Sequence, residues 1–157
     1  MNIRFATVED VPTILYLIKH LAEFEKMLHL VKATEDGLEK TLFGERRYAE
    51  VILAEEEGQV VGFALFFHNY STFFGSPGIY LEDLCVIEEF RGRGIGEALL
   101  KELAKISMER ECSHLEWCVL DWNEGAIRFY ESHGAKLKHG WVPVRVSGDE
   151  LKKLASD

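Results

Sequence analysis

The chain lacks the features that mark secreted, membrane-spanning or nucleic-acid-binding proteins. It has only three cysteines, Cys85, Cys112 and Cys118, without paired spacing, which favours a reduced intracellular chain over a disulfide-stapled one. Its longest apolar stretch, residues 60–67, is too short to cross a bilayer. Its 18 basic residues are outnumbered by 27 acidic ones, and this excess argues against a nucleic-acid-binding surface. We therefore expect a cytoplasmic protein that binds neither nucleic acid nor membranes.

What the chain does have is the composition of a soluble domain. Its 157 residues, 47% apolar and 29% charged, are enough to bury a core, and we expect a single domain over residues 1–157. The net charge of −9 would draw a small cationic partner toward a cleft, although solubility alone explains it equally well. The histidines show no spacing typical of metal ligands, so no metal site is expected.

Hydrophobic periodicity and capping residues predict an order of elements that is neither a regular βαβ repeat nor a meander. Strands are expected at residues 3–6, 49–54, 59–67, 79–87, 114–120, 136–137 and 141–146. Helices are expected from Thr7 to about Met27, from Thr34 to Gly44, from the glycines near residue 94 through Ile106, from Asn123 to Gly134, and from Ser147 onward, with a loop at residues 69–78. This order predicts an α/β fold in which helices cover both faces of a mixed sheet.

The most informative segment is a glycine-rich turn, Arg91-Gly-Arg-Gly-Ile-Gly96, between an apolar strand and an amphipathic helix. Backbone N–H groups and the helix dipole at such a turn favour a phosphate or pyrophosphate, although a purely structural turn is an equal alternative. A dinucleotide-binding fingerprint would need glycine at Glu97 or Leu99, and the Gly-Lys-Ser/Thr of a P-loop is absent. What fits is Arg-x-x-Gly-x-Gly, directly after a strand.

This turn resembles the pyrophosphate loop of the GNAT family of N-acetyltransferases. A second segment, Asp121-Trp-Asn-Glu-Gly-Ala-Ile-Arg-Phe-Tyr-Glu-Ser-His-Gly-Ala135, resembles that family's other signature, an Asn-capped helix that ends in Phe-Tyr. Tyr80-Leu-Glu-Asp and the segment from Leu17 to Glu25 are similar to the diamine (spermidine/spermine) branch, which includes enzymes acting on thialysine. The resemblance covers essentially the whole chain. It implies a mixed, mostly antiparallel twisted sheet and a homodimer.

The resemblance implies acetyl-coenzyme A as the co-substrate, without a metal. Leu84, Cys85 and Val86 would bind the pantetheine arm through their backbone, like an added strand. The pyrophosphate would be bound at Arg91, Gly92, Arg93, Gly94, Ile95, Gly96 and Glu97, where the amides from Gly92 onward form the cradle. Asn123 is either a further coenzyme ligand or a plain helix cap. Cys85 as an acyl-carrying nucleophile is not needed, because direct attack by the amine is simpler.

Two side chains are candidates for acid–base chemistry. An amine must be neutral to attack a thioester, and the resemblance makes Glu82 the candidate base, acting through water. Strand alternation predicts that Glu82 and Asp83 point to opposite faces, so Asp83 is ranked second, as a substrate ligand. Tyr130 is the candidate general acid for the leaving thiolate; a core aromatic residue is its alternative reading.

For the acceptor, the resemblance points to Phe24, Glu25, Glu82 and Trp141, because an aromatic ring beside carboxylates suits an ammonium group. Glu25 reads equally well as a solvated helix charge. One departure matters: in the spermidine enzymes the loop before the Trp141 position is longer and acidic, whereas here it is Lys138-His-Gly140. Losing that anionic contact favours a shorter amine, or one that carries its own carboxylate.

These residues together predict an acetyl-CoA-dependent N-acetyltransferase that acts directly on a primary amine of a small cationic acceptor. The acceptor stays open between a diamine or polyamine and a thialysine-like amino acid. Two alternatives are an acetyltransferase for protein N-termini or lysines, and a non-catalytic acyl-CoA-binding regulator. Loss of Glu82 or Tyr130 would indicate the regulator, and both residues are present.

Overall fold

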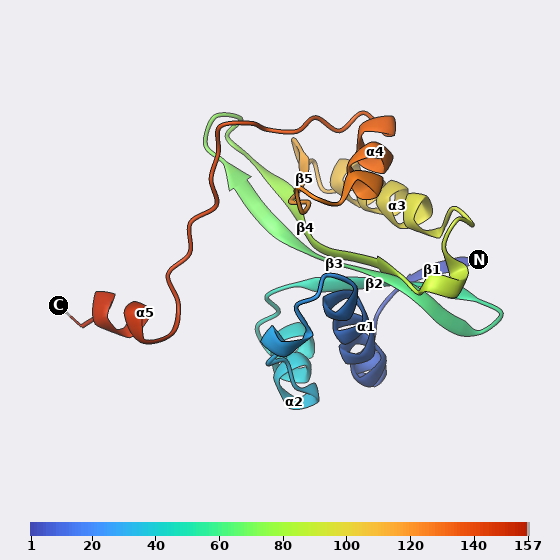
Figure 1. The fold of residues 1–157 in the computed structure, drawn as a ribbon, viewed down its shortest axis with the longest axis horizontal. Coiled ribbons are helices and arrows are strands. Elements are labelled where there is room, and N and C mark those ends of the chain that lie inside the picture. The colour runs from blue at the N-terminus through green and yellow to red at the C-terminus, as the bar shows by residue number, and fades with distance from the viewer. Residues whose placement is uncertain (157) are drawn as a thin grey trace. The chain divides into compact units, whose positions relative to one another are not determined.

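A computed structural model describes every residue except Asp157 and divides the chain into two compact units, Met1–Cys118 and Val119–Asp157. Figure 1 shows the ribbon coloured from the N-terminus to the C-terminus. The first unit contains the sheet and the helices α1 to α3, and the second contains α4 and α5. That the two units form one domain stays a prediction.

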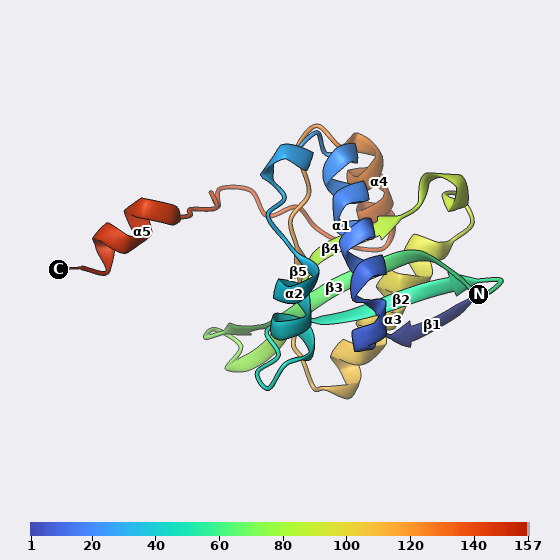
Figure 2. The same cartoon turned by 90° about the horizontal axis from the view of Figure 1, so that it is seen from below.

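The first unit is a five-stranded sheet in the order β1-β2-β3-β4-β5. All neighbouring strands are antiparallel except β4 and β5, which run parallel. Helices α1 and α2 lie on one face of this sheet and α3 lies on the other (Figures 1 and 2). The strands are β1 (Asn2–Phe5), β2 (Glu50–Glu56), β3 (Gln59–Ser71), β4 (Ser76–Val86) and β5 (Leu115–Trp117). The helices are α1 (Val11–Phe24), α2 (Glu35–Leu38), continued by a π-helical turn at Glu39–Phe43, and α3 (Ile95–Glu109).

The sheet is buried on both faces by the apolar stripes of its helices. On one face, Ile14 and Leu17 of α1 pack with a cluster of strand residues that includes Phe63 and Cys85. On α3, the stripe predicted from the sequence is buried, at Ile95, Leu99, Leu103 and Ile106. Burying each such side chain stabilises the fold by roughly 1.5–3 kcal/mol relative to exposure. These faces fix which strand residues point toward α1, and hence where a site can form.

The first turn after β1 is stabilised by a capping box and by the hydrogen bonds of Arg4. Asp10 accepts from the Thr7 N–H at 2.7 Å, as a capping box requires. Arg4 donates to both carboxylate oxygens of Asp10, at 2.7 and 2.9 Å, and to Glu55 on β2 at 2.7 Å. The Arg4 guanidinium therefore lowers the pKa of Asp10 to about 2. This network anchors the start of α1 to the sheet edge.

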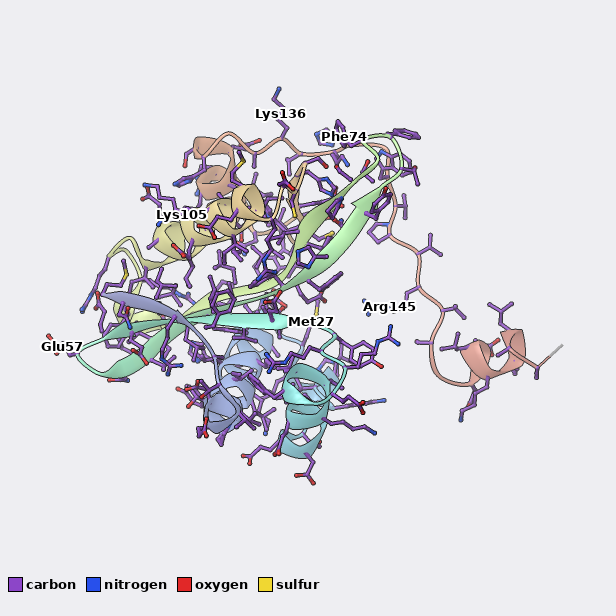
Figure 3. All side chains as sticks on the ribbon, turned by 180° about the vertical axis from the view of Figure 1, so that it is seen from behind. Met27, Glu57, Phe74, Lys105, Lys136 and Arg145 are labelled. Atoms are coloured by element: carbon purple, nitrogen blue, oxygen red, sulfur yellow. The ribbon has the colours of Figure 1, made fainter. Side chains whose placement is uncertain are left out.

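Several element boundaries differ from the sequence prediction. The expected loop at residues 69–78 is mostly strand, because β3 extends to Ser71 and β4 begins at Ser76. Figure 3 shows Glu57 and Phe74 at the two hairpin turns, at opposite ends of the long β3. Helix α1 ends at Phe24 rather than near Met27, and β5 covers only Leu115–Trp117 of the expected residues 114–120. Cross-strand pairing, which periodicity does not report, decides these limits.

The second unit contains α4 (Glu124–Ser132) and α5 (Gly148–Leu154). The Asn123 side chain caps α4 by accepting from the Ala126 N–H at 3.2 Å, and Gly134 follows the helix with a φ of +87°, both as predicted. The strands expected at residues 136–137 and 141–146 are wrong, since residues 135–147 form no strand or helix. The predicted helix after Ser147 is present, but Ser147 makes no side-chain capping bond.

Candidate functional site

A β-bulge in β4 decides the geometry of the two adjacent carboxylates. Leu65 pairs with Asp83 and the next residue, Phe66, pairs with Leu81, so Glu82 is an extra residue in β4. Paired residues share a face, and Phe63, paired with Cys85, points toward α1. Asp83 therefore also faces α1, two residues before Cys85. The alternation that would place Glu82 and Asp83 on opposite faces does not hold.

The strand before the bulge brings Glu82 to the same side. Tyr80 pairs with Phe67, two residues beyond Leu65, so Tyr80 faces α1, and alternation from Tyr80 gives Glu82 the same direction. The rings of Phe67 and Tyr80 are in contact, with centroids 5.2 Å apart. A strand without the bulge would direct only one of the two carboxylates to this side. The prediction that Glu82 and Asp83 point to opposite faces of the sheet is therefore wrong.

Three carboxylates gather where β4 meets the end of α1. Burial, with a smaller effect from the charges of Glu82 and Glu25, raises the pKa of Asp83 to about 6. Glu25 follows the last residue of α1, and partial burial raises its pKa as well. A cationic ligand would relieve the repulsion that Asp83 experiences from Glu82 and Glu25, because a nearby positive charge favours the ionised carboxylate. The arrangement suits an ammonium group.

Tyr80 is a residue of this site that sequence reasoning missed. Its hydroxyl donates to the Cys118 thiol at 3.2 Å. Burial raises the pKa of Tyr80, and the bond to Cys118 and the charges of Glu82 and Glu116 add to the rise. The phenol therefore stays protonated beside Glu82. The sequence contained one signal: Tyr80 lies two residues before Glu82, so both side chains can share a face of the strand. As part of Tyr80-Leu-Glu-Asp, Tyr80 supported the family resemblance but received no predicted role.

The glycine-rich turn has the conformation of an anion cradle. Gly92 and Gly94 have φ angles of +74° and +80°, which favour glycine, and open space lies where their side chains would be. The first i to i−4 hydrogen bond of α3 runs from the Ala98 N–H to the Gly94 carbonyl, at 2.9 Å. The N–H groups of Ile95 and Gly96 therefore have no carbonyl of their own helix to bond. These N–H groups and the helix dipole favour an anion at this end of α3.

The arginine side chains of the turn are held by the protein itself. Arg91 donates from Nε to the Val86 carbonyl at 3.0 Å, and its guanidinium lies 4.7 Å from the centre of the Phe24 ring. Arg93 lies 5.0 Å from the ring centre of Phe90 and within 3.6 Å of the Glu56 carboxylate. In this structure both guanidinium groups contact other side chains of the protein. The groups of the turn that remain for an anion are therefore its backbone N–H groups.

The strand that carries the carboxylates leaves one backbone edge open. β5 pairs with β4 only from Ile79 to Leu81, and among the described residues no other strand continues along that edge. Residues 84–86 pair with β3 on one side only, so their other side is open to an extended ligand, apart from the Val86 carbonyl that accepts from Arg91. Burial raises the pKa of the Cys85 thiol to about 11, which keeps it protonated and argues against a nucleophilic role. These features fit a pantetheine arm leading to the glycine-rich turn.

The remaining predicted site residues lie in the second unit. Tyr130 is on α4, next to Phe129, with ring centres 5.3 Å apart. Trp141 lies in the irregular segment after α4, one residue beyond the turn at His139 and Gly140. Asn123 acts as a helix cap, as described above, and its contact with a coenzyme stays a prediction. The roles of Tyr130 and Trp141 also stay predictions.

The comparisons with known proteins agree with this geometry. Residues 15–135 match the acetyltransferase (GNAT) family. The chain belongs to this family. Thialysine N-epsilon-acetyltransferase from Mus musculus is 38% identical, over 98% of this chain and 96% of the relative. An L-ornithine N5-acetyltransferase from Arabidopsis thaliana is 34% identical, over 98% of this chain and 87% of the relative.

The solved structures also confirm the GNAT fold. An integron cassette protein from Vibrio cholerae matches with a TM-score of 0.83 and 29% identity, covering 99% of this chain and 98% of that chain. The chain is thus a GNAT acetyltransferase, as the glycine-rich turn and the Asn-capped helix predicted. Within residues 1–156, no helix has the length and apolar content to span a bilayer, and no group of His, Cys, Asp and Glu side chains could hold a metal ion.

Proposed function

We propose that this acetyltransferase transfers the acetyl group of acetyl-CoA directly to a primary amine of a small cationic acceptor. The observation that carries this proposal is the β4 bulge, which turns Glu82 and Asp83 toward the end of α1. The same strand continues into an open backbone edge and the glycine-rich turn. One strand thereby serves an acceptor site before residue 84 and a donor site after it.

The donor would be held almost entirely by backbone. The open edge of Leu84–Val86 would pair with the amides of the pantetheine arm, and the amides from Gly92 to Glu97 would bind the pyrophosphate. Such an arrangement directs the thioester toward the bulge, because the arm must run along β4 from the turn. Asn123 would add a coenzyme contact beyond its role as the cap of α4.

The proposed chemistry has one step that forms the new bond. The thioester supplies an acyl group activated by its thiolate leaving group. Glu82 accepts a proton from the acceptor's ammonium, through water, so that the neutral nitrogen can attack the carbonyl carbon. The C–N bond forms, the C–S bond breaks, and Tyr130 donates its phenolic proton to the departing thiolate. The new amide nitrogen then gives up its second proton, which returns to the Tyr130 phenolate and restores the phenol. The protonated Cys85 thiol supports direct transfer rather than an acyl-enzyme.

For the acceptor, we propose an amino acid with a side-chain amine, of the thialysine or ornithine kind. Two observations support it. The named activities of the relatives are on such amino acids. The loop at His139 lacks the carboxylate that the diamine branch uses for a long polycation. Phe24, Glu25 and Asp83 would bind the ammonium end, with Trp141 as a further contact. We also propose a cytoplasmic homodimer.

The test is an amine panel with purified protein and acetyl-CoA. It compares thialysine, ornithine, lysine, putrescine and spermidine, and measures the free thiol released as coenzyme A. The proposal expects the highest kcat/KM for thialysine or ornithine, and only background hydrolysis without amine. Preference for spermidine would refute the acceptor class. If the protein binds acetyl-CoA but acetylates no amine, peptide N-terminus or peptide lysine, the proposed enzymatic activity is refuted and a regulator is indicated.

A further inference from the structure

Arg91 makes two contacts that tie the donor turn to the acceptor helix. Its Nε donates to the Val86 carbonyl, at 3.0 Å, at the end of β4. Its guanidinium lies over the Phe24 ring, 4.7 Å from the ring centre, and Phe24 is the last residue of α1. One side chain thus bridges the first residue of the glycine-rich turn, the end of β4 and the end of α1.

These contacts direct the guanidinium away from an anion cradle and toward the acceptor side. The backbone N–H of Arg91 also binds within the protein, to the Glu88 carbonyl at 3.1 Å. The charge of Arg91 acts on Cys85, which faces α1, and lowers the pKa of that thiol against the larger effect of burial. The side chain therefore lies on the α1 side of β4, where Asp83 and Cys85 point.

The turn after α1 combines backbone hydrogen bonds with one unfavourable backbone conformation. The turn after α1 is closed by Glu25 N–H to the Leu21 carbonyl at 2.9 Å and by Met27 N–H to the Ala22 carbonyl at 2.7 Å. Lys26, between them, has a φ of +60°, which is unfavourable for a residue other than glycine. The Arg91 guanidinium contacts Phe24 directly before this turn, and Glu25 lies near enough to Asp83 for its charge to raise the Asp83 pKa.

We propose that Arg91 is a positioning residue that couples the two substrate sites, rather than a side-chain ligand of the pyrophosphate. It holds the Phe24–Glu25 end of α1 against β4, so that the acceptor's ammonium meets Glu25 and Asp83 together. Binding of the donor's pyrophosphate to the neighbouring amides orders the turn that carries Arg91. Donor binding therefore strengthens acceptor binding. This inference rests on the proposed function of the site.

The experiment is a double-mutant cycle with Arg91→Gln, Phe24→Leu and both together. The affinity for acetyl-CoA is measured by calorimetry, and KM and kcat are measured with the preferred amine. We expect Arg91→Gln to raise the amine KM about tenfold in the unmodified protein and to raise it little further in Phe24→Leu, because Phe24→Leu has already removed the Arg91–Phe24 contact. The Kd for acetyl-CoA should change less than about threefold. Arg91→Lys, which keeps the charge over the ring, should restore part of the lost amine affinity.

The matched control is a second arginine–aromatic pair outside the site. Arg46 lies 4.9 Å from the Tyr48 ring centre, at nearly the same distance as Arg91 from Phe24. Arg46→Gln and Tyr48→Leu should leave the amine KM unchanged. A further readout needs no turnover. Hydrogen exchange at the amides of residues 24–27 should accelerate in Arg91→Gln and in Phe24→Leu, and not in the control variants.

The outcomes separate this inference from the proposed function. If Arg91→Gln weakens acetyl-CoA binding tenfold or more while Phe24→Leu does not, Arg91 is a pyrophosphate ligand and the inference is wrong. Additive effects of the two variants on KM would also refute it. If no amine is turned over but exchange at residues 24–27 responds as expected, the proposed function fails while the link between turn and helix stands.

Discussion

The raised pKa of Asp83 predicts that removing this carboxylate stabilises the fold. Asp83 has an ordinary pKa of 3.8, and burial with the nearby charges of Glu82 and Glu25 raises it to about 6. The difference is about two pKa units, and each unit corresponds to about 1.36 kcal/mol. Asp83→Asn keeps the shape of the side chain and removes its charge. We expect this variant to unfold with a free energy about 3 kcal/mol higher at pH 8.

The pH dependence gives the prediction its sign. Well below pH 3.8, Asp83 is protonated in the folded and unfolded states alike, so its ionisation costs no stability. Between pH 4 and 6 the unfolded chain ionises first, and the stability of the unmodified protein falls as the pH rises. Above pH 6 both states are ionised and the cost is constant. The advantage of Asp83→Asn should therefore be small at pH 4, about 0.5 kcal/mol, and complete by about pH 7.

The assay is thermal and urea unfolding followed by circular dichroism at pH 4, 5, 6 and 8. For a chain of this length, 3 kcal/mol corresponds to a Tm shift of about 6–12 °C. Asp10→Asn is the matched control, because the same substitution removes a carboxylate whose pKa is lowered to about 2 by Arg4. Asp10→Asn should change stability in the opposite direction. Above pH 4 this variant should have a free energy of unfolding lower by about 1 kcal/mol, after allowance for solvent screening. An Asp83→Asn gain that is as large at pH 4 as at pH 8, or is absent at pH 8, would refute the reasoning.

Three further predictions test the site. Tyr130→Phe should lower kcat about 100-fold with acetyl-CoA affinity retained, and unchanged turnover would remove Tyr130 from the mechanism. Glu82→Gln should lower kcat/KM, and the loss should be greatest at lower pH, where the amine is most protonated. A loss of the same size at every pH would argue against a role for Glu82 as the base. Gly94→Ala should weaken acetyl-CoA binding and cost about 1–2 kcal/mol of stability, because alanine resists the φ of +80°. Calorimetry would measure the change in acetyl-CoA affinity, and thermal unfolding would measure the loss of stability. Unaltered affinity would show that the positive φ of residue 94 is not needed for binding the coenzyme.

The sequence predicted most of the fold because its signals are local. The stripe of α3, the Thr7–Asp10 cap and the Asn123 cap each depend on residues three or four apart. The strands expected at residues 136–137 and 141–146 failed for a non-local reason. Alternating apolar residues form a strand only where another strand supplies hydrogen bonds, and within the second unit none does.

By itself, the sequence determined the glycine-rich turn, the Asn-capped helix and therefore the acetyltransferase family, because these motifs are contiguous and their chemistry is carried by backbone and local caps. Only the tertiary structure decided that Glu82 and Asp83 face the same side, since the bulge arises from the pairing of β4 with β3. It also decided that Asp83 is buried near Glu25, and that Arg91 reaches Phe24 rather than the cradle. Those contacts join residues about 60 positions apart, and no periodic pattern in the chain encodes them.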